Sequence, residues 1–237
     1  MHLKRSILFA AAGVLALVSQ ASQAVVTIDL YGTAINVDGT ETVLVDVYTT
    51  VDPAPAGVSL AGFDTTTGLG TITATITGLG AHTIDLFVDH EIDESTNTFY
   101  NEFGAATGVL AAGQSWEIDE PGYVSGDIYD NFKFSTLDNT NGVPSGFEDD
   151  VSMALGWDFT LAADETARII FELSTVAPAG GFYLTHTDPD SNASIYFNSA
   201  LEIRSEAPGV PAPATLVLMA AGVLGLGGVA RRRTGRR

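Results

Sequence analysis

The sequence VSMALGWDFTL, residues 151–161, decides the fold of this chain. Apolar residues occupy every odd position from Val151 to Leu161, while small or polar residues occupy the even positions. A period of two places the apolar side chains on one face of an extended strand. We therefore expect a central strand of a β-sheet whose apolar face lies in the core.

The same period returns along most of the chain. Residues 25–48 predict a hairpin, because Asp38-Gly39 is a strong short-range hairpin signal. Residues 84–88 are expected to pair antiparallel with residues 71–77. About ten strands at this spacing predict an all-β fold, an antiparallel β-sandwich with a jelly-roll-like arrangement. The remaining expected strands are 115–118, 129–135, 169–173, 182–187, 194–197 and 201–203.

Two segments interrupt the pattern. Residues 50–68 are rich in proline and glycine, so we expect a connection across the end of a sheet. Residues 89–114 lose the periodicity and form the longest irregular segment, of the kind that often carries function. Further along, the expected core aromatics are Trp116, Phe132 and Phe134.

The first 24 residues predict a secretory signal peptide. Lys4 and Arg5 precede an apolar run at residues 7–18, and Ser22-Gln23-Ala24 places small residues where signal peptidase reads them. Cleavage is expected after Ala24. The acidic β-sandwich domain is then expected over residues 25–205.

The other end predicts a membrane segment. A linker and motif, residues 206–213, close with Val210-Pro211-Ala212-Pro213. Residues 214–230 carry neither charge nor proline, and as a helix they would span about 26 Å at ~1.5 Å per residue, enough to cross a bilayer core. The tail, residues 231–237, is basic and is expected to stay in the cytoplasm, leaving the preceding domain outside the inner membrane. It begins with Arg231, Arg232 and Arg233.

From Val210 onward, this arrangement resembles the C-terminal sorting signal of PEP-CTERM proteins. The resemblance implies that an exosortase-like enzyme recognises Pro211 and Pro213 and removes the tail, after transient retention in the inner membrane. It also implies a final location at the cell surface or outside the cell. Ala212 stands where the family usually has glutamate, which leaves open which exosortase variant acts. The alternative is a membrane anchor that is never cut.

The negative charge of the expected domain limits the kinds of molecule that it can bind. Between the two terminal segments, residues 25–209 contain all 29 acidic residues but only Lys133, Arg168 and Arg204 as basic ones, so 3 − 29 gives a formal charge of −26. Such a surface repels phosphate backbones, so we expect no nucleic-acid partner. The chain has no cysteine, so its stability depends on the core and on any bound metal.

One loop has the composition of a calcium site. Asp188, Asp190 and Asn192 place oxygen-bearing side chains at alternate positions between two expected strands, which suits a hard cation. Structural calcium is therefore the one cofactor that the sequence suggests. The alternative is an exposed turn in which these side chains bond their own backbone.

A second acidic group follows the strand at residues 84–88. Asp89, Glu91, Asp93 and Glu94 must either spread in water or share a cation, and exposure is the default expectation. His90 is a candidate transition-metal ligand beside them, although three histidines in the domain offer little material for a zinc site.

No catalytic motif is assembled in the sequence, so we expect a non-enzymatic protein. Exposed aromatic side chains on outward strand positions and in the irregular segment favour saccharide contact. We expect a structural, adhesive or polysaccharide-associated surface protein, the alternative being a secreted carbohydrate-active hydrolase or lectin. The aromatic candidates are Tyr31, Tyr48, Phe99, Tyr100, Phe103, Tyr183 and Tyr196.

Overall fold

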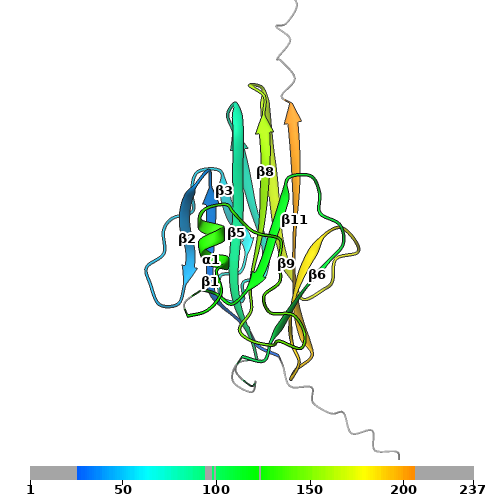
Figure 1. The fold of residues 1–237 in the computed structure, drawn as a ribbon. Helices are drawn as coiled ribbons and strands as arrows, with labels where there is room; N and C mark the ends of the chain where they lie inside the picture. Colours follow the sequence, from blue (N-terminus) through cyan, green and yellow to red (C-terminus); the bar gives the residue numbers. More distant parts are fainter. Residues whose placement is uncertain (1–25, 94–97, 99, 123, 206–237) are drawn as a thin grey trace, which may run out of the picture.

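A computed structural model describes residues 26–93, 98, 100–122 and 124–205, which form a sandwich of two antiparallel sheets (Figure 1). The described residues contain eleven strands where the sequence predicted about ten, and the expected all-β class is confirmed. The five-stranded sheet has the order β2-β1-β5-β8-β7: β1 (Ile28–Val37), β2 (Thr40–Asp46), β5 (Gly80–Ile92), β7 (Gln114–Asp119) and β8 (Ser152–Leu161). The six-stranded sheet has the order β3-β4-β9-β11-β10-β6: β3 (Val58–Phe63), β4 (Gly70–Thr77), β6 (Phe103–Thr107), β9 (Glu165–Ser174), β10 (Tyr183–Asp188) and β11 (Ala193–Ser205).

Strand β8 lies between β5 and β7, as an interior strand should. Its odd-numbered side chains, from Met153 to Leu161, are buried in the main core between the sheets. The period-two prediction for this stretch is therefore confirmed.

The opposite face of β8 is also largely buried, because a second layer covers it. The short helix α1 (Ile128–Lys133) and the loop after it pack there and form a smaller apolar cluster around Phe87 and Phe132. Ala154 of β8 belongs to this cluster, while Asp158 and Thr160 lie beyond the cover and are exposed.

Helix α1 corrects the prediction of a strand at residues 129–135. Ile128 and Phe132 are four residues apart and both fully buried, which is the spacing of one helix face. Phe134, expected in the core, follows the helix and is 70% exposed. Trp116 packs partly buried against the main core.

The first hairpin is confirmed. Strands β1 and β2 pair antiparallel around Asp38 and Gly39, whose φ angles are 51° and 77°. Both values are positive, as a two-residue hairpin turn of the favoured type requires.

The expected pairing of residues 71–77 with residues 84–88 is wrong. Strand β4 pairs with β3 and β9 in one sheet, while β5 pairs with β1 and β8 in the other. The Gly78-Leu79-Gly80 link has positive φ at both glycines and carries the chain from one sheet to the other. A glycine-rich link allows either geometry, so local sequence does not decide between them.

Two strands lie in segments expected to lack them. Strand β3 is an edge strand within residues 50–68, with a register shift between Ser59 and Gly62. Strand β6 is the other edge of the same sheet and falls within residues 89–114. Short and irregular edge strands show little periodicity in their own sequence. Their strand conformation depends on pairing with residues that are distant in the sequence.

The signal peptide, the motif at Val210 to Pro213, the apolar segment and the arginine tail lie outside the described residues. Within the ranges that are described, no helix is long and apolar enough to cross a membrane.

Candidate functional site

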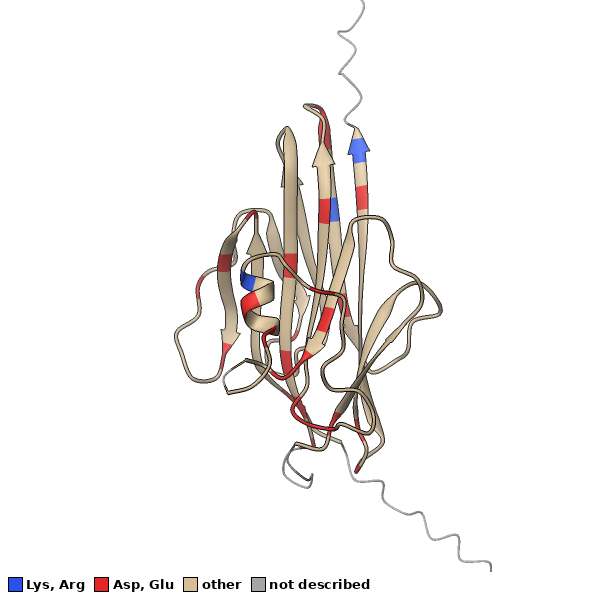
Figure 2. Ribbon diagram, in the orientation of Figure 1, with Lys and Arg blue, Asp and Glu red and all other residues tan. Residues whose placement is uncertain are grey.

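Acidic residues gather at one end of the sandwich, where β5 ends and β8 begins (Figure 2). We call this the acidic end and define it by Asp89, Glu102, Asp149, Asp150 and Asp188. The described Lys and Arg residues, Lys133, Arg168 and Arg204, lie on α1, β9 and β11, away from this end.

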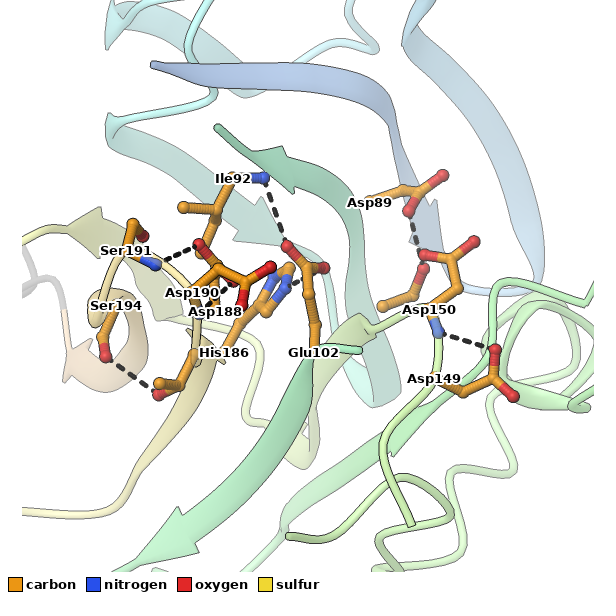
Figure 3. Close-up of polar contacts among 12 residues, drawn as sticks. Asp89, Ile92, Glu102, Asp149, Asp150, His186, Asp188, Asp190, Ser191 and Ser194 are labelled. Carbon is orange, nitrogen blue, oxygen red and sulfur yellow. Dashed lines mark hydrogen bonds and ion pairs between the residues drawn. The ribbon is translucent and has the colours of Figure 1, made fainter. Parts of the chain in front are cut away.

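A buried acid–base pair lies at the centre of the acidic end (Figure 3). His186 on β10 is fully buried, and its Nε2 lies 2.5 Å from Oε2 of Glu102, which is 3% exposed. Strand pairing brings them together, because β10 aligns His186 with Gly104 of β6, two residues after Glu102. The backbone N–H of Ile92 donates to the other carboxylate oxygen at 3.3 Å. The pair thus links β5 and β10 to the residue that directly precedes β6.

Asp89 and Asp150 extend the acidic end toward the surface. The hydroxyl of Ser152 donates to Oδ1 of Asp89 at 3.0 Å, and Asp89 is 5% exposed. Burial, with the negative charges of Asp150 and Glu102, raises the pKa of Asp89 to about 7. Burial and the same kind of repulsion raise the pKa of Asp150 to about 6. Its Oδ1 is buried and has no hydrogen-bond partner among the described residues.

His90, the candidate metal ligand, lies inside the same end but is held neutral. Burial, and then the electrostatic effect of the neighbouring His186, lower the pKa of His90 to about 3. Its Nε2 lies 3.3 Å from the carbonyl oxygen of Gly68. The acidic group at residues 89–94 was expected to be exposed, and for Asp89 this expectation is wrong. Strand β5 continues through Ile92, and the Asp89 side chain is buried within it.

A cleft of about 370 Å³ opens beside these buried groups. We call it the acidic cleft. Asp150 belongs both to its wall and to the buried cluster, while Tyr100 is 67% exposed at its rim. Burial, and then the negative charge of Asp149, raise the pKa of Glu120. The lining residues are Tyr100, Glu120, Pro121, Val124, Ser125, Asp149 and Asp150.

The predicted calcium ligands lie in the turn between β10 and β11, at the same end. Asp188 is fully buried, and its two carboxylate oxygens accept the backbone N–H groups of Asp190 and Ser191, each at 2.9 Å. Asp190 accepts the backbone N–H of Thr98 at 2.9 Å, and Asn192 has a φ of 58°. These bonds fit the alternative of a self-bonded turn, while calcium binding here stays a prediction.

Among the described residues, a different carboxylate group has the spacing of a possible metal site. Oxygens of Glu117, Asp119 and Asp127 lie within 4.8 Å of one another. Each of the first two already accepts hydrogen bonds, Glu117 from Asn131 and Asp119 from the backbone of Asp127. Burial raises the pKa of Glu117 to about 7. The period-two spacing of Glu117 and Asp119 on β7 was the only signal in the sequence for this group.

The outward tyrosines form two pairs elsewhere on the surface. Tyr31 and Tyr48 meet edge to face at 6.3 Å, and Tyr48 is 77% exposed. Tyr183 and Tyr196 meet similarly at 5.9 Å, and both are half-buried.

Comparisons with protein-family models, with curated proteins and with solved structures found no match to this chain. We therefore infer the function from the residues and geometry of this chain. A cleft that combines an exposed aromatic ring with carboxyl groups of raised pKa is the arrangement most typical of a ligand site.

Proposed function

We propose that this chain is an exported surface or extracellular-matrix protein of the PEP-CTERM type, sorted by an exosortase-like enzyme. The signal peptide, the Pro211-Ala212-Pro213 motif, the apolar segment and the arginine tail support the sorting. The jelly-roll-like arrangement is part of the proposal, supported by chain crossings between the sheets after β2, β4, β5, β6 and β8.

Sorting is tested by intact-mass measurement on the protein recovered outside cells of a host that has an exosortase. Loss of residues 1–24 and of the basic tail is expected. A mature chain that still ends at Arg237 would contradict processing and favour the uncut anchor.

The molecular role that we propose is saccharide binding at the acidic cleft, without catalysis. One observation carries this proposal: Tyr100 is exposed at the rim of a cleft that also presents carboxyl groups and Ser125. Aromatic faces stack on sugar rings, and carboxylates and hydroxyls accept or donate hydrogen bonds to sugar hydroxyls. The volume falls at the small end of the range for ligand sites, which suits one or two rings at a time.

Binding is tested with the purified full chain in mild detergent, screened against neutral, amino and acidic polysaccharides. Tyr100→Ala is expected to weaken binding strongly, whereas Phe134→Ala removes a similarly exposed ring outside the acidic cleft and serves as the matched control. Saccharide binding is contradicted if no polysaccharide binds, and binding at the acidic cleft is contradicted if Tyr100→Ala binds as the unmodified chain does.

A second candidate function is glycoside hydrolysis, favoured by the raised pKa of Asp150 beside Asp149 in the cleft. A carboxyl group whose pKa is raised toward neutral can act as the general acid, with a second carboxylate as its partner. Release of reducing ends from a bound polysaccharide, lost in Asp150→Asn, would establish this activity. Binding without any release would leave the non-catalytic role.

A further inference from the structure

His82 lies at the pole of the sandwich opposite the acidic end, near the start of β5 (Figure 1). It follows the link at residues 78–80, which carries the chain from β4 in one sheet to β5 in the other. Thr77, the last residue of β4, pairs with Thr166 of β9. The residue before Thr166, Glu165, pairs with Ser205. The β4–β5 link therefore lies at the same pole as Ser205, where β11 ends.

Both ring nitrogens of His82 face oxygen atoms that accept hydrogen bonds. Nδ1 lies 2.9 Å from Oδ2 of Asp38, and Nε2 lies 3.0 Å from the carbonyl oxygen of Gly78. An ionised carboxylate and a backbone carbonyl have no proton to donate. A neutral imidazole has one N–H group and an imidazolium has two, so the charged ring satisfies both contacts and the neutral ring satisfies one.

The surroundings of His82 favour the charged ring. The hydrogen bond to Asp38, and then the one to the Gly78 carbonyl, raise the pKa of His82 above its ordinary value, while burial acts in the opposite direction. The ring also stacks on Phe159 of β8, with the ring centres 5.7 Å apart, a contact that attracts a cation. Among the described residues, Asp38 is the charged group in contact with the ring.

The Asp38 side of this arrangement is firmly held. Oδ1 of Asp38 accepts the backbone N–H of Thr83 at 2.9 Å, and the backbone N–H of Asp38 donates to the carbonyl oxygen of Thr83 at 3.0 Å. These two bonds fix the β1–β2 turn to β5 without any contribution from the His82 ring.

The β4–β5 link is easier to move. Gly78 and Gly80 have φ angles of 118° and 129°, and the side chain of Leu79 between them is 75% exposed. Glycine changes its backbone conformation at little steric cost, and an exposed side chain loses little packing when it moves. A change in the charge of His82 therefore acts on the link more than on the turn.

We propose that protonated His82 is a pH-sensitive switch that holds the β4–β5 link against the β1–β2 turn, and that loss of its proton releases the link. The neutral ring keeps one N–H, and the bond to a charged carboxylate is the stronger of the two. Nε2 then presents a lone pair to the carbonyl oxygen of Gly78, and the two atoms repel each other.

The direction of the switch follows from the sign of the pKa shift. The folded state binds this proton more tightly than the unfolded chain does. The contribution of the His82 contacts is therefore fully present below the ordinary pKa of 6.5 and is lost as pH rises through the raised value. This inference is independent of the proposed saccharide binding, which concerns the other pole.

The test is NMR spectroscopy of the purified full chain in mild detergent, recorded as a function of pH. The His82 ring should carry protons on both nitrogens at pH 6.5 and titrate with a midpoint above that value. The amide group of Leu79, which is bonded to the Gly78 carbonyl, should shift with the same midpoint. Nitrogen relaxation should show greater motion of the link above the midpoint than below it.

Asp38→Asn should lower the midpoint of His82 toward 6.5, because it removes the charge from the partner of Nδ1. Asparagine suits the positive φ of 51° at this position, so the turn is retained. Asp164→Asn is the matched control, because it removes the same charge from the exposed turn between β8 and β9 at the same pole. Its midpoint should equal that of the unmodified chain.

Each alternative result overturns a stated part of the inference. A midpoint at or below 6.5 would mean that His82 is neutral in the folded state at neutral pH, and the switch would be rejected. A raised midpoint without a matching shift at Leu79 would leave an ion pair that does not control the link. A fall in midpoint with Asp164→Asn as large as that with Asp38→Asn would mean that the general negative charge of the domain, rather than this contact, holds the proton.

Discussion

Four buried ionisable residues have the largest pKa shifts among the described residues and contribute to the pH response of this domain. Burial raises the pKa values of Asp85, Asp89 and Glu117 to about 7. Unfolded Asp and Glu titrate near 4, so the native state binds these protons more tightly. The stability linked to the three carboxyls is fully present below pH ~4 and is lost as pH rises through about 7.

His90 has the opposite effect, because its folded pKa is lowered to about 3. Its contribution is present above the unfolded value of ~6.5 and is lost as pH falls through about 3. Together, the four groups give a domain that is most stable in mildly acidic solution.

Asp89→Asn is expected to raise stability in mildly alkaline buffer by up to about 4 kcal/mol, since its pKa shift from 3.8 to about 7 spans about three units and one unit corresponds to ~1.4 kcal/mol. The gain should vanish at pH ~4, where the native carboxyl is protonated. Thermal unfolding across the pH range measures both effects. Asp164→Asn controls for the loss of one charge from an acidic surface, and an equal gain in that variant would contradict a role for burial.

The sequence prediction was least accurate for helix α1 and the loop after it, where a strand was expected. Phe132→Ala should destabilise the domain by about 3–5 kcal/mol, because a fully buried ring leaves a cavity. Phe134→Ala should change stability by less than about 0.5 kcal/mol, because that ring is exposed. Urea unfolding of the two variants distinguishes this helix from the expected strand, in which both rings would be buried.

The turn between β10 and β11 carries the calcium prediction. Millimolar calcium is expected to raise the melting temperature relative to chelator, and Asp190→Asn should reduce the rise. Asp119→Asn, in the carboxylate group on β7, provides the comparison. If calcium leaves the melting temperature unchanged, the prediction for Asp188, Asp190 and Asn192 fails; if only Asp119→Asn reduces the rise, the ion binds elsewhere.

Strands with a long run of alternating apolar residues were predictable from the sequence, but the strands with which they pair were not. Residues 151–161 specify their own buried face, and Asp38-Gly39 specifies its own turn, because both signals are local. Strand β3, strand β6 and the separation of β4 from β5 depend on pairing across the sandwich. Helix α1 was missed because six residues contain too few turns to show a helical period.

The acidic end was predictable in part for the same reason. Asp89, His90 and Asp188 stood out as polar residues beside strands. Glu102 meets His186 only because β6 pairs with β10, and the two residues are 84 positions apart. Asp149 and Asp150 directly precede the strongest strand, yet nothing local indicates that a cleft opens there.

At the scale of the whole molecule, acidic residues far outnumber basic ones, and like charges repel one another in the compact state. Raising sodium chloride from ~10 mM to ~150 mM shortens the screening length from about 30 Å to about 8 Å. We expect the melting temperature to rise over this range in the presence of chelator. A fall would mean that attractive pairs outweigh the repulsion.

The chain leaves the described sandwich at Ser205, where β11 ends, at the pole opposite the acidic end (Figure 1). Strand β11 has 13 residues, which at ~3.3 Å each corresponds to about 43 Å along the sandwich. If residues 214–230 anchor the chain as proposed, the acidic cleft lies at the end of the sandwich remote from Ser205, where the chain continues toward the anchor. A tethered protein would then present the proposed binding cleft at the end remote from its anchor, so capture of a matrix polymer would not have to wait for release from the membrane.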